Sequence, residues 1–197
     1  NQQLNVTLTG LNGGRGIRVV DSEEDGHINN FAANLRWRTP PGRAAQLELG
    51  GGYLNGTIYN AAVAEHIDPD VIGPNNAAWD VNAKLRIRNL RLAGEYVQTV
   101  NAWPATGHEV IAYRTEAAYD MYFAGMPTRS SVSWSEGIQG APGTEFEFNR
   151  QLVLGWSIQP SRNALLTFEY VRSSGFAPLI NIQRVSDSEV VQNSVVL

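Results

Sequence analysis

Apolar and polar residues alternate along most of the chain with a period of two. In the clearest run one face is wholly apolar and consists of Trp79, Val81, Ala83, Leu85 and Ile87. The residues between them are mostly charged, namely Asp80, Asn82, Lys84, Arg86 and Arg88. Successive side chains of a β-strand point to opposite faces of its sheet, so the run predicts a strand with two unlike faces. The alternation resumes after Asn89 and predicts a hairpin.

The same alternation recurs from end to end, whereas helical periodicity is hard to find. It predicts about ten strands, at residues 4–11, 30–37, 45–54, 79–87, 90–99, 113–123, 129–136, 146–158, 164–172 and 190–197. The links after the second, fourth, sixth and eighth strands are short and rich in turn residues, at 39–43, 88–89, 125–128 and 159–163. The other links are longer, and the longest span residues 57–76 and 173–189. Short turns on one rim and long loops on the other are typical of outer-membrane barrels.

We therefore expect an all-β protein with a single domain over residues 1–197, an antiparallel up-and-down transmembrane β-barrel with both termini at the periplasmic rim. A soluble β-sandwich or lipocalin-like barrel is the alternative, because its strands also alternate. The charges within single strands favour the membrane barrel, since a polar lumen accommodates series such as Arg114, Glu116 and Asp120. Aromatic residues near the predicted strand ends are consistent with the two girdles of such a barrel.

Arg150 does not fit this pattern. The alternation places it on the apolar face of the predicted strand 146–158, near the middle of the membrane, where an arginine costs roughly 2–4 kcal/mol. A β-bulge at residues 149–151 or a neighbouring subunit would relieve that cost.

Composition excludes several other classes of protein. No stretch approaches the roughly 18 consecutive apolar residues of a membrane-spanning helix. There are no cysteines, which excludes disulfides, thiolate metal sites and thiol catalysis. The net charge is −4 without any basic run, which argues against nucleic acid as a partner. No signal segment precedes residue 1, so we expect a mature or truncated chain.

Several short segments resemble the LbtU-like siderophore porin family of outer-membrane barrels in order and spacing over most of the chain. They lie at residues 28–35, 49–55, 94–97, 116–119 and 168–170. The resemblance implies additional strands upstream of this chain, and a last strand that ends in an aromatic residue. The chain instead ends at residues 195–197 with Val-Val-Leu. We therefore expect it to be the C-terminal part of a larger barrel, truncated at both ends.

The charged residues of the polar face are the candidate functional residues. The predicted lumen-lining set is Arg36, Arg38, Lys84, Arg86, Arg88, Arg91, Arg114, Glu48, Asp80, Glu95, Glu116, Asp120 and Glu169. Opposed basic and acidic walls would order ions in an open channel. Cross-strand ion pairs that fill the interior are the alternative, as in narrow barrels. More than ten strands would favour the channel, and closure at ten would favour the filled lumen.

Other chemistry is weakly indicated. The three histidines, His27, His66 and His108, fall in predicted long loops, and the neighbouring acids Asp25, Asp68 and Asp70 only superficially resemble the rim of an omptin-like protease. We expect no enzyme activity, no metal site and no cofactor. The glycines at 50–52, inside a predicted strand, indicate a bend, a bulge or a close contact.

Together these features predict a porin-like channel of the bacterial outer membrane, through which small, anionic solutes such as siderophore chelates diffuse. Its expected partners are membrane lipid, lipopolysaccharide and a small-molecule solute, with a homo-oligomer left open. The alternative is a non-conducting structural or interaction barrel whose extracellular loops bind a partner.

Overall fold

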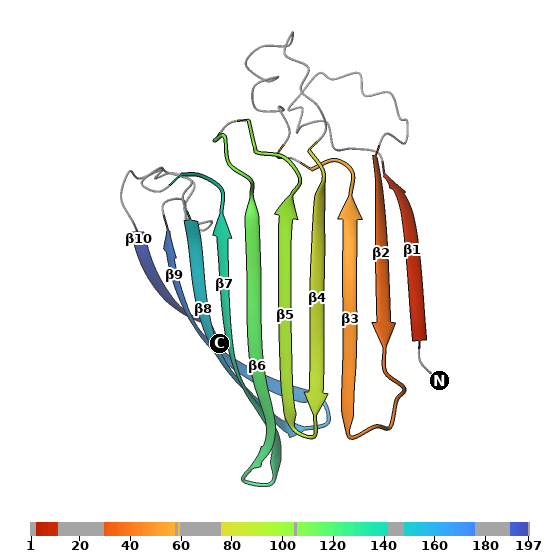
Figure 1. Cartoon of the computed structure of the whole chain (residues 1–197). Helices are drawn as coiled ribbons and strands as arrows, with labels where there is room; N and C mark the ends of the chain where they lie inside the picture. The colour runs from red at the N-terminus through yellow and green to blue at the C-terminus, as the bar shows by residue number, and fades with distance from the viewer. Residues whose placement is uncertain are drawn as a thin grey trace.

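Ten β-strands form one antiparallel sheet, in which neighbouring strands of the sheet are also neighbours in the sequence (Figure 1). The computed structural model describes residues 3–11, 30–57, 59, 76–104, 106–141, 148–175 and 190–196. The strands are β1 (Gln3–Leu11), β2 (Asn30–Arg38), β3 (Ala45–Leu54), β4 (Ala78–Ile87), β5 (Leu90–Thr99), β6 (Ile111–Phe123), β7 (Met126–Ile138), β8 (Phe148–Ser161), β9 (Ala164–Gly175) and β10 (Val190–Val196). The predicted up-and-down order of ten strands is confirmed.

The links between strands alternate in length as the sequence predicts. One rim, the turn rim, carries the short links at 39–44, 88–89, 124–125 and 162–163, and the opposite loop rim carries the longer ones. The β6–β7 link is shorter than the predicted 125–128, because Ala124 and Gly125 both adopt positive φ and reverse the chain in two residues. Arg88 also has positive φ. It lies in the turn, where the predicted link at 88–89 places it, and so it does not belong to the strand face with which the alternation also grouped it.

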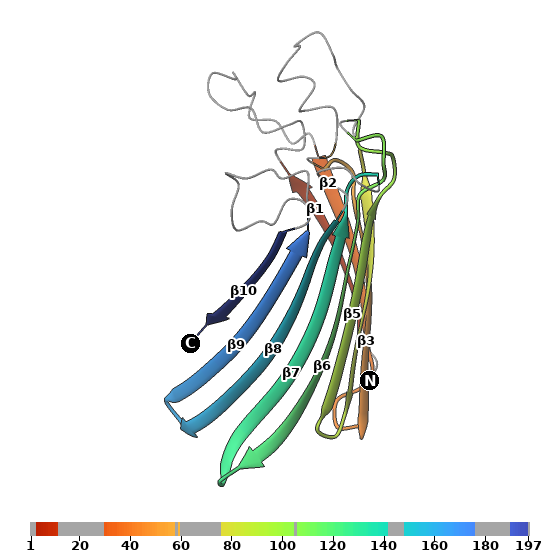
Figure 2. The ribbon, with the colours of Figure 1, turned by 90° about the vertical axis from the view of Figure 1, so that its left-hand side faces the viewer.

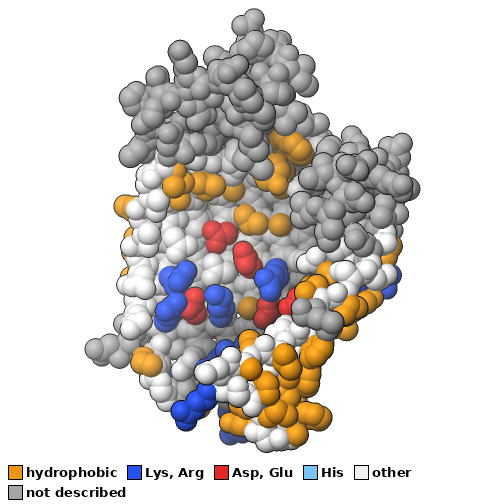
Figure 3. Space-filling view, turned by 180° about the vertical axis from the view of Figure 1, so that it is seen from behind, with side chains coloured by type: hydrophobic (Ala, Val, Ile, Leu, Met, Phe, Trp, Pro, Cys, Tyr) orange, Lys and Arg blue, Asp and Glu red, His pale blue; other side chains and the backbone are white. Residues whose placement is uncertain are grey.

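The sheet is strongly curved, with β8, β9 and β10 bent away from the plane of β3, β4 and β5 (Figure 2). Residues opposite one another in antiparallel strands share a face, so the registers place all strand residues on two faces. The convex face carries the apolar series, including Leu8, Leu35 and Val81, which are all at least half exposed. The concave face carries most of the charged residues (Figure 3).

The sheet has almost no hydrophobic core. Among the described residues the buried hydrophobic side chains are Ala77, Ala78, Val110, Ala118 and Ile158, and no large side chain is fully buried. Soluble domains bury the apolar face of a sheet against a second layer. This sheet is a single layer in the described part of the chain, so its apolar face requires a covering other than its own helices or strands. No described helix is long and apolar enough to cross a membrane.

The two edges of the sheet are open. β1 pairs only with β2, and β10 only with β9, within the residues that the structure describes. The ten described strands therefore form an open arc, and the structure does not show a closed barrel. An open edge leaves a row of backbone N–H and C=O groups without strand partners. The structure thus shows an antiparallel, up-and-down, curved sheet with unlike faces.

Two asparagines hold the loop rim together. The buried Asn76 side chain donates hydrogen bonds to the carbonyls of Tyr59 (2.8 Å) and Asn101 (2.9 Å), and it accepts one from the Asn101 amide (3.0 Å). Asn30, also buried, donates to the carbonyl of Gly56 at 2.8 Å. The backbone groups just beyond the ends of β3 and β5 lie outside the hydrogen-bond ladder of the sheet. The two asparagine side chains provide their hydrogen-bond partners.

Replacing Asn76 by alanine should destabilise the fold by about 2 kcal/mol, because the hydrogen bonds of its side chain to Tyr59 and Asn101 are lost. Urea unfolding of the folded protein, followed by tryptophan fluorescence, measures this change. Asn163→Ala in the exposed β8–β9 turn is the matched control and should leave the midpoint unchanged. Equal effects of the two substitutions would contradict the role given to Asn76.

Candidate functional site: the charged concave face

Three cross-strand rows bring the charged residues of β2 to β6 together. Arg38, Glu48, Lys84, Ala93 and Glu116 are successive partners in one row. The next row toward the turn rim contains Gln46, Arg86, Arg91 and Ala118, and the next row toward the loop rim contains Arg36, Gly50, Asn82, Glu95 and Arg114. Residues far apart in the sequence thereby share one face because the period-two alternation continues in register across five strands.

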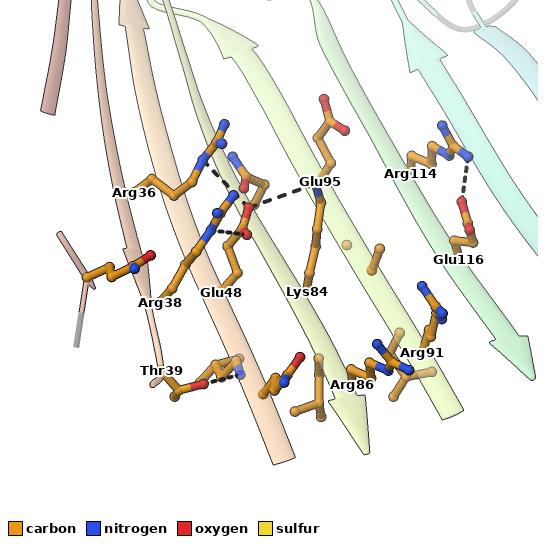
Figure 4. A pocket seen from close by; sticks show the side chains of 18 of the residues that line it. Arg36, Arg38, Thr39, Glu48, Lys84, Arg86, Arg91, Glu95, Arg114 and Glu116 are labelled. Atoms are coloured by element: carbon orange, nitrogen blue, oxygen red, sulfur yellow. Dashed lines mark hydrogen bonds and ion pairs between the residues drawn. The ribbon is translucent and has the colours of Figure 1, made fainter. Parts of the chain in front are cut away.

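Glu48 is the acidic centre of the β2–β4 part. Its carboxylate lies 2.5 Å from Arg38 Nε, 3.6 Å from Arg36 Nε and 3.9 Å from Lys84 Nζ (Figure 4). The Glu48 side chain is only 17% exposed, whereas the three cations are each more than 40% exposed. One carboxylate is thus shared by three cations whose charged ends remain accessible from the concave side.

Asp120 has the same role between β5 and β7. Arg91 Nε and Arg129 Nε each donate a hydrogen bond to its carboxylate at 2.7 Å. Arg129 was not among the predicted lumen residues. The sequence signal for it was its place in alternation with Ser131, Ser133 and Ser135, because this polar series is the concave face of β7.

Arg86 differs from the other cations of this face. Its cross-strand neighbours are Gln46 and Arg91, and no described acidic side chain lies within ion-pair distance of it. Arg114, in contrast, contacts Glu116 on its own strand at 2.6 Å. Like charges directly opposite one another in a sheet are destabilising. The Arg86–Arg91 pair is therefore a place where this face carries uncompensated positive charge.

These side chains border a hollow of about 930 Å³ on the concave side. Its charged lining consists of Arg36, Arg38, Lys84, Arg86, Arg91 and Arg114 with Glu48, Glu95 and Glu116. Six basic residues thus face three acidic ones. Figure 4 shows the charged ends from β2 to β6 projecting into this common space.

Neutral residues dominate the concave face nearer the loop rim. The predicted close contact at the glycines is confirmed, because a Cβ at Gly52 would lie 2.1 Å from Asp80 Oδ2 and one at Gly50 would lie 2.6 Å from Asn82 Oδ1. A second hollow of about 470 Å³ lies here, bordered by Tyr59, whose hydroxyl accepts a hydrogen bond from Gln139 at 3.1 Å. The hollow in the loop-rim part of the face is therefore smaller and less charged than the one in the turn-rim part.

The registers place twelve of the thirteen predicted lumen residues on the concave face, and Arg88 is the exception. Glu169 lies on β9, opposite Gly155, and is distant from the β2–β6 cluster. Basic and acidic residues do not form separate opposed walls within the described arc. They form neighbouring ion pairs, which is the pattern of the alternative prediction.

Arg150 lies on the convex face but not at mid-height, contrary to the prediction. It is opposite Glu136 and Ser174, each next to or near the loop-rim end of its strand. Arg150 Nε donates a hydrogen bond to Glu136 at 2.7 Å, and the Tyr113 hydroxyl donates to the same carboxylate. The ladder has no bulge at 149–151, and its irregularity lies between Ile158 and Ser161. The predicted strand start at 146 lies outside the described residues.

No group of three or more His, Asp or Glu side chains in the described ranges could hold a metal ion. His108 forms a backbone bridge with Trp103 in the β5–β6 link. His27 and His66, with Asp25, Asp68 and Asp70, lie outside the described residues. Compared with known proteins, the chain matches no protein-family model and no curated protein.

Replacing Glu136 by leucine should destabilise the protein by about 1–2 kcal/mol, because Arg150 and Tyr113 lose a nearly buried carboxylate. The double substitution Glu136→Leu with Arg150→Leu should recover most of this loss, since it removes both charges from an apolar face. Chemical unfolding of the single and double variants measures both effects. A double variant less stable than Glu136→Leu would contradict this account.

Proposed function

We propose that this chain is part of an outer-membrane β-barrel that acts as a porin-like channel for small anionic solutes. The observation that carries the proposal is the single-layer sheet, which has an exposed apolar convex face and a charged concave face. Hydrocarbon on one side and water on the other satisfy both faces at once. The resemblance to LbtU-like siderophore porins supports the same role and extends it to siderophore chelates.

Strand length and aromatic placement support membrane insertion. Nine of the ten strands have 9 to 14 residues, against about 9–11 needed to cross a bilayer. Aromatic pairs occur at two levels of the convex face. Phe31–Tyr53 and Trp79–Tyr96 lie toward the loop rim, and Phe123–Trp156 and Trp156–Phe168 lie toward the turn rim. Such rings prefer the headgroup level of a bilayer.

The same geometry accounts for Arg150 and Glu136. Both lie near the loop rim, in the row that also contains Tyr113 and Tyr96. At the headgroup level an ion pair is hydrated, and its cost falls to about 0–1 kcal/mol. The convex face would then contact lipid and, at the loop rim, lipopolysaccharide. Catalysis and a cofactor have no place in this proposal.

The positive surplus of the hollow supports anions as the solutes. Rings of charged side chains set the selectivity of a water-filled pore. The non-conducting interaction barrel is the second candidate function, and the observation that favours it is the ion pairing of Glu48 and Asp120. In a narrow barrel such pairs fill the lumen.

Membrane insertion predicts which tryptophans contact lipid. Trp134 lies on the convex face and is 38% exposed, whereas Trp103 lies in the β5–β6 link and packs edge-on against Tyr59. We expect brominated lipids to quench a variant that keeps only Trp134 several-fold more strongly than one that keeps only Trp103. The other four tryptophans are replaced by phenylalanine in each variant. Absence of quenching at Trp134 in vesicles would exclude a lipid-facing convex face.

Channel function predicts a change of ion selectivity on charge reversal inside the hollow. Arg86→Glu should shift the reversal potential in a planar bilayer under a salt gradient toward cations, because it removes the uncompensated positive charge. Arg162→Glu, in the exposed β8–β9 turn, is the control and should have a smaller effect. A folded, inserted protein without conductance would favour the interaction barrel.

A further inference from the structure

We propose that the turn-rim half of the charged hollow is a binding site for a small oligoanion, held by Lys84, Arg86 and Arg91 above the short side chain of Ala93. The inference rests on the proposed function, because it assigns the class of solute that the lumen takes. It adds a saturable site to what would otherwise be free diffusion.

The register places the three cations around Ala93. Lys84 is its direct partner on β4, Arg91 is two residues before it on the same face of β5, and Arg86 is the direct partner of Arg91. Ala93 and Ala118 fill little of the space between the longer side chains, and Ala93 is part of the lining of the hollow. The cations thus border an open position that no described side chain occupies.

The acids near this position are shared by two or more cations, or paired with another cation as Glu116 is with Arg114 at 2.6 Å. Lys84 has only a 3.9 Å contact with Glu48, whose closest cation is Arg38. Arg91 shares Asp120 with Arg129, and Arg86 has no described acidic partner. An anion between Arg86 and Arg91 would neutralise two like charges that otherwise repel each other. This unmet charge is the strongest reason to place a ligand here.

The donors define the ligand chemistry. Lysine and arginine offer N–H donors and no acceptor, and the planar guanidinium pairs in two-point fashion with carboxylate or phosphate. Glu116, the direct partner of Ala93 on β6, is paired with Arg114, and Glu95 lies in the next row toward the loop rim, so a second anion would be repelled on that side. The site therefore suits a compact molecule with two or more carboxylate or phosphate groups. The whole hollow, of which this site is the turn-rim half, has a volume of about 930 Å³.

Direct binding to the full chain, folded in detergent, tests the site without requiring a channel. Isothermal titration calorimetry at low salt is run with citrate and with pyrophosphate as probes, because screening weakens such contacts at high salt. We expect saturable binding of at least one probe. Arg86→Ala should weaken it about tenfold or more, as expected for loss of a hydrogen bond to a charged group. Arg86→Lys should retain part of the affinity, since lysine keeps the positive charge but lacks the planar pair of N–H donors of a guanidinium.

Arg162→Ala is the matched control and should leave the affinity unchanged. Preference for citrate would assign a polycarboxylate and preference for pyrophosphate a polyphosphate. Binding of neither probe, or equal losses in Arg86→Ala and Arg162→Ala, would overturn the site. Unchanged circular dichroism of the variants confirms that they fold. Arg86-dependent binding without conductance would refute the channel and retain the site, whereas conductance without binding would refute the site alone.

Discussion

The apolar convex face of the sheet has no second layer of protein against it in the described part of the chain, and the other features depend on this constraint. Side chains such as Leu8 and Val6 are among the most exposed of the structure. A sheet in water would hide them, because the cost of exposing apolar surface grows with its area. The described sheet therefore buries few hydrophobic side chains, and the covering of its convex face has to come from outside the sheet.

The concave face follows from the same alternation. Because successive side chains of a strand point to opposite faces, every second residue lies on the concave face, and strands paired in register bring these residues together. The acids Glu48 and Asp120 hold five cations between them, which keeps the side chains extended over the sheet. The cations still outnumber the acids, and among the described cations of the hollow Arg86, close to the turn rim, has no acidic partner.

Two residues show the limits of alternation as a guide. Arg88 continues the polar alternation of β4, but β4 ends at Ile87. Residues 88–89 form the two-residue turn to β5. The alternation correctly places Arg150 on the convex face, but it does not say how far along the strand a residue lies between the two rims. The register pairs Arg150 with Glu136 on the neighbouring strand β7, fourteen residues earlier in the sequence, and this pairing places it near the loop rim.

The sequence by itself determined the number of strands, their antiparallel order, the two faces and twelve residues of the concave face, because period-two alternation and turn residues are local signals. Only the tertiary structure decided which charges meet, since cross-strand partners depend on register. In the structure Arg129 forms an ion pair with Asp120, and Arg86 lies opposite Arg91 without a described acidic partner. The Asn76 side chain forms hydrogen bonds with Tyr59 and Asn101. The tertiary structure also decided that the described strands form an arc, because closure depends on what lies beside β1 and β10 and not on any pattern within them.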